Sequence, residues 1–570
     1  MTQINEVRPV KHRLPFIALA LALSAPALAK PLPVPSVTPV ALSQPGLEEM
    51  VRTLSSDAFE GRAPSTAGED KTVAYLIDRF KAAGLQPGNK GSWTQDVPTV
   101  EITAQNVAGL AVTGGKQTML FAPGKDFVAG SYRVTASTDI RDAELVFVGY
   151  GINAPELGWN DYAGIDMKGK IAVILVNDPD YETASEQGLF KGRRMTWYGR
   201  WPYKFEEAAR QGAAGALIVH DTFPAAYGWN VVESSWGGAQ YFVQKPNDAM
   251  DQTQANGWVQ NDVAKQILAA AGQDLTALSA AAKQKGFKPV PLGLKASLKF
   301  DNQIRKGQSR NVIGILPGKK RPDEYVLYTA HWDHLGRCKA DAQGDDVCNG
   351  AVDNATGTAL LASLAQANVK AGAADRSQVF LAVTLEESGL LGSEFYAQNP
   401  VYPLNRTVGG VNMDAIAPGS PARDVQVTGG DKSELTRYLK AAMGAMKLYE
   451  TPEDHVERGH YYRSDHFSMA KRGVPMFAVG RGSDWVPGGK AAAEAVAGKY
   501  VKNDYHQPSD QFDGKWDWSG ILQEGELYYR LGRSLAMTTD WPNWHPGDEF
   551  RAIRDQSRAE LRAKTGKAGK

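Results

Sequence analysis

The C-terminal half of this 570-residue sequence predicts an α/β fold, with a mostly parallel mixed sheet and helices on both faces. From about residue 310, short apolar runs alternate with amphipathic segments, in the order EYVLYTA, TALLASLAQANVKA, QVFLAVTL, TVGGVNMDAI, KSELTRYLKAAMGAM and VPMFAVG. Such an alternation is typical of parallel strands joined by crossover helices. In sheets of this kind ligands bind beyond the carboxyl ends of the strands, so those ends are the first place to look for a site.

The first 29 residues predict a secretory signal peptide. Basic residues (Arg8, Lys11, Arg13) precede the apolar stretch LPFIALALALSAPALA, which ends in the small-residue pattern Ala-Leu-Ala at Ala29. An uncleaved membrane anchor is the alternative, but the apolar stretch is shorter than the roughly 20 residues that a spanning helix needs. We therefore expect an exported protein, periplasmic or secreted, without a membrane anchor after cleavage.

The segments between the signal peptide and residue 310 indicate a divided domain. Residues 30–46 are Pro-rich and predict an extended leader. Helical periodicity follows in 47–88, whereas β-like runs dominate 99–180. A β-rich block with one or two helices thus separates two α/β regions. The predicted division is a main domain formed by 47–125 and 300–570, with an inserted domain at 126–299.

Composition excludes few functions but favours a globular protein. Lys plus Arg and Asp plus Glu both total 63, which gives no indication of a nucleic-acid partner, and 43% of the residues are hydrophobic. The two cysteines, Cys338 and Cys348, lie close together in HLGRCKADAQGDDVCNG. In an exported protein a disulfide between them is favoured over free thiols or a metal pair. The oligomeric state does not follow from the sequence.

Histidine and carboxylate side chains follow the apolar runs of the C-terminal half. They are His331 and Asp333 after the first run, Glu386 and Glu387 after the next, Asp414 after the third, and Asp353 and His506 in loops expected at the same edge. Taken singly, each has an ordinary explanation, such as a surface histidine, a solvated turn or a helix N-cap. These explanations do not predict that successive strands end in metal-ligating residues. Carboxylates at one sheet edge repel one another unless a cation lies between them.

The types of these side chains indicate the metal. Histidine and carboxylate ligands without cysteine favour zinc, with cobalt or manganese as alternatives. A site for two ions about 3.5–4 Å apart needs one bridging carboxylate, a histidine and a carboxylate for each ion, and a base for the attacking water. The residues named above supply these groups and leave one carboxylate over.

Six motifs carry a resemblance to a known family. HWDHLG, NGAVDNATG, LEESGLLGSEFY, NMD, SDHFSMAKRGVP and DYHQPSD resemble, in order, the signatures of the M28 family of zinc-dependent exopeptidases. Upstream, LSSDAFEGRAPSTAGEDKTVAYLIDRFKAAGLQP is similar to the N-terminal helices of that family. The middle block, with VGYGINAPELGWNDYAGIDMKGKIAVIL, resembles a protease-associated domain, which is inserted in one branch of the family.

The resemblance implies a zinc exopeptidase fold, a peptide substrate and a role for each ligand. It assigns His331 and Asp414 to one zinc ion, Glu387 and His506 to the other, and Asp353 to the bridging position. Glu386 is then the general base. Asp333 is expected to orient the imidazole of His331 through its second ring nitrogen. The family also implies a cis peptide bond after the bridging aspartate, between Asp353 and Asn354.

Other residues of the motifs have less defined roles. His334 is expected to be structural, because the family pattern does not require it. Four residues correspond to the family's segment near the substrate, namely Tyr461, Tyr462, Asp465 and His466. The SDH sequence within this segment also has an ordinary explanation as a helix N-cap.

Three functions are compatible with these motifs. The first is an exported di-zinc aminopeptidase. The second is a carboxypeptidase of the same family, with Arg458, Arg463 or Arg481 receiving the carboxylate of the substrate. The third is a non-catalytic binding protein that keeps the fold, although such proteins usually lose ligands or the base. The sequence contains no HExxH, GxSxG or GxxxxGK[ST] motif, so it does not indicate the other common types of hydrolase active site.

Overall fold

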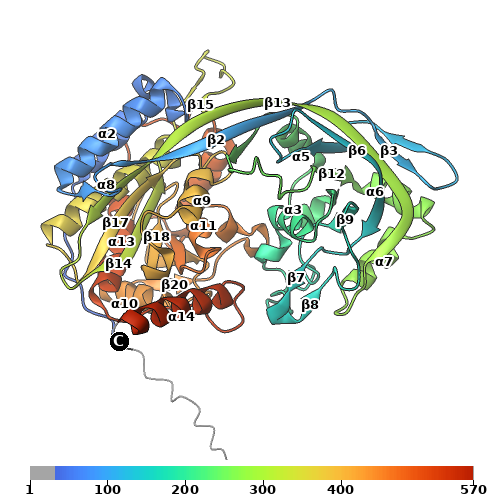
Figure 1. Cartoon of the computed structure of the whole chain (residues 1–570). Coiled ribbons are helices and arrows are strands. Elements are labelled where there is room, and N and C mark those ends of the chain that lie inside the picture. Colours follow the sequence, from blue (N-terminus) through green and yellow to red (C-terminus); the bar gives the residue numbers. More distant parts are fainter. Residues whose placement is uncertain (1–31, 569–570) are drawn as a thin grey trace, which may run out of the picture. The chain divides into compact units, whose positions relative to one another are not determined.

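The computed structural model describes residues 32–568, and its central feature is a mixed β-sheet in the C-terminal half (Figure 1). The signal peptide expected at residues 1–29 lies outside the described residues. Along the sheet the strands follow in the order β1 (Gln86–Pro87), β13 (Val290–Leu316), β17 (Arg376–Val383), β14 (Arg321–His331), β18 (Thr407–Asn412), β21 (Met476–Arg481), β19 (Asp424–Thr428) and β20 (Tyr449–Thr451). The central strands β17, β14, β18 and β21 are parallel, whereas β13 and β19 pair antiparallel to them. The predicted fold class is confirmed.

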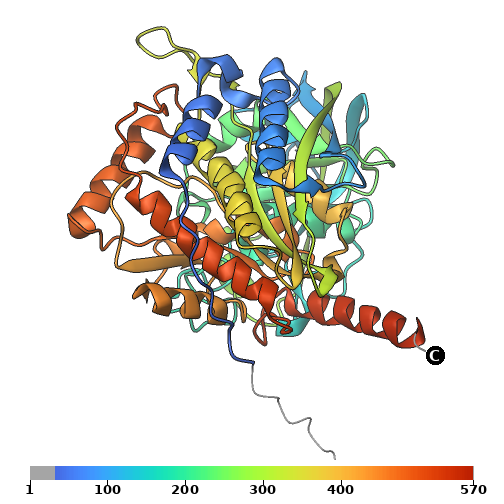
Figure 2. The ribbon, with the colours of Figure 1, turned by 90° about the vertical axis from the view of Figure 1, so that its left-hand side faces the viewer.

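Helices cover both faces of this sheet because its strands are apolar on both sides. In β17, Phe380 and Ala382 pack into one hydrophobic cluster with α8 (Gly357–Lys370) and α13 (Ser519–Met537). The alternate residues Val379, Leu381 and Val383 pack into another cluster with α9 (Leu391–Gln398) and α11 (His466–Ala470). Figure 2 shows α8 in yellow and α13 in red together with α1 (Gln44–Leu54) and α2 (Ala67–Ala83) in blue.

The segment 126–299 builds further strands onto the same sheet. Here β6 (Ser137–Phe147), β9 (Ile171–Leu175), β10 (Gly215–His220) and β12 (Ala255–Gln260) are parallel neighbours, and β5 (Phe127–Gly130) pairs antiparallel to β12. The helices of this segment are α3 (Trp201–Arg210), α4 (Thr222–Ala225), α5 (Trp229–Trp236), α6 (Asn261–Ala270) and α7 (Leu275–Ala282). The sequence predicted one or two helices in this segment, and the structure has more. Several of them are short, and a short helix shows little periodicity in the sequence.

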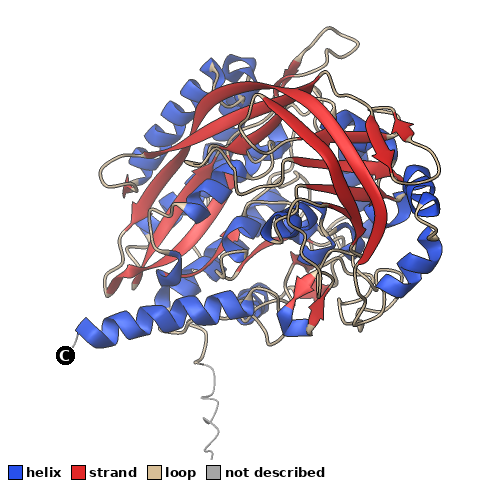
Figure 3. Ribbon diagram, turned by 45° about the vertical axis from the view of Figure 1, so that its right-hand side comes forward, coloured by secondary structure: helices blue, strands red, loops and turns tan. Residues whose placement is uncertain are grey.

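One long strand joins the two parts of the sheet. The 27 residues of β13 pair with β6 near their start, with β2 (Thr94–Gln105) in the middle and with β17 at their end. Figure 3 shows these long strands as curved red ribbons. The predicted domain boundary at 299/300 falls within β13, so the inserted segment is continuous with the main sheet at this point. The boundaries of the insert stay a prediction.

The remaining elements are short or peripheral. The strands are β3 (Leu110–Thr113), β4 (Met119–Phe121), β7 (Asn153–Ala154), β8 (Trp159–Asn160), β11 (Gln240–Val243), β15 (Gly336–Arg337) and β16 (Val347–Cys348), and the helices are α10 (Thr436–Met446), α12 (Gly489–Lys499) and α14 (Arg551–Ala568). The short turns η1 (Asp57–Arg62), η4 (Ala351–Thr356) and η8 (Tyr500–Asp504) matter for the site. No helix within residues 32–568 combines the length and the apolar character needed to cross a membrane.

The Pro-rich leader and the two cysteines both contact the rest of the protein. The Pro-rich leader ends earlier than predicted, because α1 begins at Gln44. Within the leader, Val37 is buried in the core and its carbonyl accepts a hydrogen bond from Arg530 at 2.9 Å. Cys338 and Cys348 are joined as a disulfide whose Cα atoms lie 6.0 Å apart.

Candidate metal centre

The parallel strands bring the predicted ligands to one edge of the sheet. His331 is the last residue of β14, Glu386 and Glu387 follow β17, and Asp414 follows β18. Asp353 lies in η4, directly before α8, and joins them from a loop. Since parallel strands end at the same edge, side chains separated by many positions in the chain meet there.

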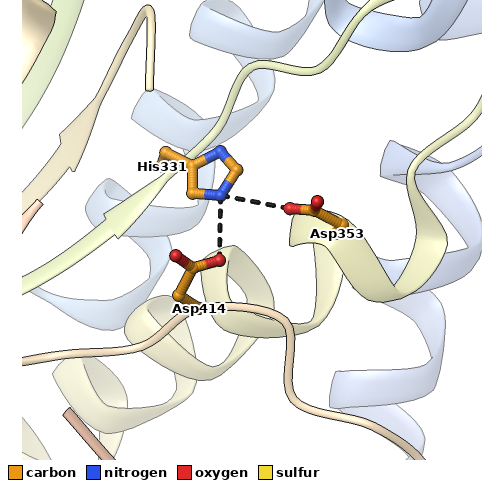
Figure 4. A group of neighbouring side chains, drawn as sticks. All are labelled: His331, Asp353 and Asp414. Carbon is orange, nitrogen blue, oxygen red and sulfur yellow. Dashed lines mark hydrogen bonds and ion pairs between the residues drawn. The ribbon is translucent and has the colours of Figure 1, made fainter. Parts of the chain in front are cut away.

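The first half of the site is formed around His331. Its Nε2 lies 3.1 Å from Oδ1 of Asp414 and 3.3 Å from Oδ1 of Asp353 (Figure 4). The imidazole is only 1% exposed. The second oxygen of Asp414 accepts a hydrogen bond of 2.5 Å from the hydroxyl of Ser464, which fixes the carboxylate in this orientation.

The second half is formed around His506, which follows η8. Its Nε2 lies 3.1 Å from Oε2 of Glu387 and 3.4 Å from Oδ2 of Asp353. Asp353 therefore presents one carboxylate oxygen to each half of the site. His334, which we expected to be structural, lies against the second half: its Nδ1 is 2.6 Å from Oε1 of Glu387.

The charges of these groups depend on one another. Burial alone would lower the pKa of His331, but the carboxylates of Asp414 and Glu386 outweigh it and raise the pKa well above its ordinary value. Burial would likewise lower the pKa of His506, yet its contacts with Asp353 and Glu387 raise it to about 10. The buried carboxylates therefore favour the protonated, positively charged form of both histidines, and they would favour a bound cation for the same reason.

The donor set fits divalent metal ions. Among the described residues, groups with ligand atoms within 4.8 Å of one another are His331, Asp353 and Asp414; His331, Glu386 and Glu387; and His334, Asp353 and Glu387. The buried Nε2 atoms of His506 and His334 make no hydrogen bond. Nitrogen and oxygen ligands without cysteine are those that zinc accepts. The residues present therefore fit the two-ion arrangement that the sequence predicts, whereas the number of ions stays a prediction.

Glu386 differs from its neighbour Glu387. Glu387 contacts two histidines, but no ion pair joins Glu386 to a histidine among residues 32–568. Burial raises the pKa of Glu386 well above its ordinary value, and Asp414 and Asp465 raise it further against the effect of His331. A carboxylate that is not tied to a histidine and binds a proton readily is suited to act as a general base.

Asp333 lies beside the second ring nitrogen of His331 and has a further contact with Glu386. Nδ1 of His331 lies 3.2 Å from the main-chain oxygen of Asp333, but 3.7 Å from its carboxylate. The carboxylate also accepts a hydrogen bond of 3.2 Å from the main-chain N–H of Glu386. Asp333 therefore lies against the second ring nitrogen of His331 through both its main chain and its carboxylate, and it also contacts Glu386.

The residues expected near the substrate are buried. The Tyr461 hydroxyl donates to the carbonyl of Met476 at 2.8 Å, and the Tyr462 hydroxyl donates to Glu549 at 2.7 Å. The side chains of Asp465 and His466 are buried without a hydrogen-bond partner. Asp465 precedes α11 but does not cap it, so the N-cap explanation is not supported. Contact of these four residues with substrate stays a prediction.

The arginines considered for carboxylate binding are not equivalent. Arg481 donates to Glu524 at 2.6 Å and to the carbonyls of Gly419 and Ser420, so it is engaged inside the protein. The guanidinium groups of Arg458 and Arg463 make no hydrogen bond or ion pair with the part of the chain that the structure describes. Of the three arginines, only Arg458 and Arg463 therefore have a guanidinium group that is available to bind a ligand.

Sequence reasoning missed several residues that support the site. Ser464 holds Asp414, while Arg62 and Asp510 contact the segment that carries Asp353. Ser464 is the first residue of SDH and Asp510 the last residue of DYHQPSD, so both lie within the motifs and their positions could have indicated a role. Arg62 lies in an ordinary polar stretch, and nothing local marks it as buried. The peptide bond between Asp353 and Asn354 is cis, as the resemblance implied.

A mixed α/β sheet that collects histidines and carboxylates at its carboxyl edge places this chain among the α/β proteins, with a candidate metal site at that edge. More particularly, residues 311–530 match the model of peptidase family M28. The match includes every ligand named above and ends before the C-terminal helix α14.

Individual relatives are similar over parts of the chain. A glutamate carboxypeptidase 2 homolog from Caenorhabditis elegans is 31% identical over 207 residues, which are 34% of this chain and 24% of the relative. The aminopeptidase NAALADL1 of Mus musculus is 32% identical over 138 residues, 23% of this chain and 17% of the relative. The chain thus spans a quarter or less of the length of these two proteins.

Two solved structures are also similar over most of their length. The aminopeptidase from Aneurinibacillus sp. strain AM-1 is 21% identical and gives a TM-score of 0.47, with 88% of this chain and 96% of the other covered. A zinc aminopeptidase from Bacillus subtilis is 18% identical with a TM-score of 0.41, over 92% of this chain and 100% of the other.

Proposed function

We propose that this protein is an exported aminopeptidase that holds two zinc ions and removes N-terminal residues from peptides. The observation that carries the proposal is the position of Asp353, whose two carboxylate oxygens face His331 and His506 respectively. A carboxylate shared in this way between two histidine-containing groups is what a bridging ligand requires.

Each ion has its own set of residues in this proposal. His331 and Asp414 would hold one ion, His506 and Glu387 the other, and Asp353 both. When bound, the zinc ions would polarise the scissile carbonyl and make water easier to deprotonate. His334 contacts the same carboxylate as His506, through its other oxygen, so it would steady Glu387.

Glu386 would move the proton. Its carboxylate accepts a proton from the attacking water and passes it to the leaving amine, which makes that amine a better leaving group. Two features support this role: Glu386 is not bound to a histidine, and Asp333 fixes its main chain beside the ligands. The buried surroundings that raise its pKa favour the return of the proton.

The charge of the site supports cleavage at the amino end. Besides the ligand carboxylates, Glu386, Asp333 and Asp465 lie at the same edge and interact electrostatically with it. In their ionised form these additional acids would attract a free α-amino group, which is positively charged at neutral pH, and repel a carboxylate. Two relatives named above carry the names aminopeptidase and glutamate carboxypeptidase, so the names do not decide the direction.

A carboxypeptidase is the second candidate, and one observation favours it. Arg463 directly precedes Ser464, which holds Asp414, and its guanidinium has no partner within the described residues. A free arginine this near to a metal ligand is positioned to receive the terminal carboxylate of a peptide.

Export is supported by the disulfide between Cys338 and Cys348, because such bonds persist in oxidising compartments. It agrees with the signal peptide that the first 29 residues predict. Fractionation of cells that express the full chain, with N-terminal sequencing of the product, would test both statements. A cytoplasmic protein that keeps residues 1–29 would contradict them.

The test of the activity is metal content combined with three substrates. A free-amino aminoacyl anilide, its N-acetylated form and an N-blocked peptide with a free carboxyl end would be incubated with and without a chelator. About two zinc ions per chain and chelator-sensitive cleavage of the free-amino anilide alone would support the aminopeptidase. Shortening of the N-blocked peptide from its carboxyl end would favour the carboxypeptidase. Zinc without any hydrolysis would leave the binding protein as the remaining explanation.

A further inference from the structure

A buried arginine from the N-terminal region reaches the segment that carries the bridging aspartate. Arg62 is 1% exposed, and its guanidinium donates to the carbonyls of Asn349 at 2.6 Å and Gly350 at 2.8 Å. It also donates to the carbonyl of Trp332 at 2.9 Å, directly after His331. One side chain thus ties together the two loops that supply His331 and Asp353.

The backbone of η1 makes this approach feasible. Glu60, Gly61 and Arg62 all have positive φ angles, near 52°, 64° and 52°. A Cβ atom on Gly61 would lie 2.5 Å from the carbonyl oxygens of Cys348 and Gly336, so only glycine fits against the disulfide-linked strands β15 and β16. Arg62 is therefore directed inward by a turn that packs against the hairpin of the disulfide.

Asp510 holds the same segment from its other side. Its carboxylate is buried and accepts hydrogen bonds from the main-chain N–H groups of Val352 at 2.9 Å and Asp353 at 3.1 Å. Its main-chain oxygen accepts from the N–H of Ala351 at 3.0 Å. Asp510 lies four positions after His506, so it links the loops of both halves of the site.

The two charges match the polarity of the backbone between them. The carbonyls of Asn349 and Gly350 point towards the positive Arg62, and the N–H groups of Val352 and Asp353 point towards the negative Asp510. Hydrogen bonds to charged groups are stronger than those between neutral groups. Such a segment has little freedom to shift, and a small shift would move the Asp353 oxygens relative to both histidines.

We propose that Arg62 and Asp510 are positioning residues that clamp residues 349–353 and so fix Asp353 between the two halves of the metal site. Arg62 lies outside the segment that matches the M28 family, so this role belongs to the N-terminal part of the chain. The inference rests on the proposed metal binding. It concerns the geometry of the site before any substrate is bound.

The test compares metal binding in Arg62→Lys and Asp510→Asn with the wild type. Lysine keeps the charge of Arg62 but has one nitrogen in place of the three with which Arg62 reaches separate carbonyls, and asparagine keeps the size of Asp510 but loses its charge. Zinc affinity would be measured by competition with a fluorescent chelator, and ligand geometry by the absorption spectrum of the cobalt(II) form. We expect zinc to bind about 10–100-fold more weakly in both variants, with an altered cobalt spectrum.

Arg554 provides a matched control. It is 2% exposed and donates to the carbonyls of Thr407 at 2.9 Å and Val408 at 3.1 Å, at the start of β18 and thus at the opposite end from Asp414. Arg554→Lys should lower the melting temperature but leave zinc affinity and the cobalt spectrum unchanged. This separates positioning of the site from general stability.

The possible results have distinct meanings. Wild-type zinc affinity in Arg62→Lys and Asp510→Asn would overturn the clamp, as would an equal loss in Arg554→Lys. If Arg62→Lys does not fold, Asp510→Asn decides the question alone. If the wild-type protein itself binds no zinc, the proposed function fails first, and that outcome is visible before any variant is compared.

Discussion

Replacing Glu386 by glutamine should stop turnover without removing metal. Glutamine has the size of glutamate but cannot accept the proton from water, and the main-chain hydrogen bond from residue 386 to Asp333 is kept. General acid–base catalysis contributes about 10²–10⁴-fold in rate, which corresponds to about 2.7–5.4 kcal/mol in the activation barrier. Glu386 has no ion pair with a histidine in the described chain, so zinc affinity should stay near that of the wild type.

The adjacent glutamate supplies the contrast. Glu387 lies 2.6 Å from His334 and 3.1 Å from His506, so Glu387→Gln should lose metal from the second half of the site. Hydrolysis of a free-amino anilide gives kcat and KM, and mass spectrometry of the metals gives the zinc content of both variants. Loss of zinc in Glu386→Gln, or turnover within tenfold of the wild type, would refute the division of roles between the two residues.

The remaining predictions concern stability. A Cβ on Gly532 would lie 2.2 Å from the Tyr328 hydroxyl. Gly532→Ala should therefore lower the free energy of unfolding by about 1–3 kcal/mol, measured in urea, while the zinc content stays unchanged. An unaltered free energy of unfolding would contradict this close contact. Cys338→Ser should cost about 2–3 kcal/mol, because the disulfide closes a loop with a separation of 10 residues, and a reductant should have no further effect on this variant. Burial favours protonation of Glu549, but Lys432 outweighs it and lowers the pKa to about 2. The ionised Glu549 carboxylate therefore stabilises the folded state fully above pH 4.5, the ordinary pKa of a glutamate, and this stabilisation is lost as the pH falls towards 2. Glu549→Gln should make the melting temperature decline less steeply between these pH values. A decline as steep as in the wild type would be evidence against this role of Glu549.

The sequence alone predicted where the candidate metal ligands lie. Each apolar run identifies a strand, and the residue after it must lie at the carboxyl end of that strand. Once the helix–strand alternation makes the strands parallel, His331, Glu387 and Asp414 have to meet at one edge, as they do in the structure. The positions follow from short-range patterns and one rule of topology, whereas the choice of His331 and Glu387 over their neighbours came from the resemblance to the M28 family.

The surroundings of the ligands were decided by tertiary structure. Asp333 was expected to use its carboxylate on His331, and the structure adds two contacts: its main-chain oxygen lies 3.2 Å from the ring, and its carboxylate accepts a hydrogen bond from Glu386. Arg62 is 270 positions from Trp332, whose carbonyl it binds, and no local pattern shows that a polar side chain will be buried so far from its partner. The extent of β13, which carries the chain through a predicted domain boundary, likewise depends on successive strand partners. Periodicity fixes where a strand ends, whereas the orientation of a turn and the partner of a buried charge follow from contacts between distant segments, which a single sequence does not display.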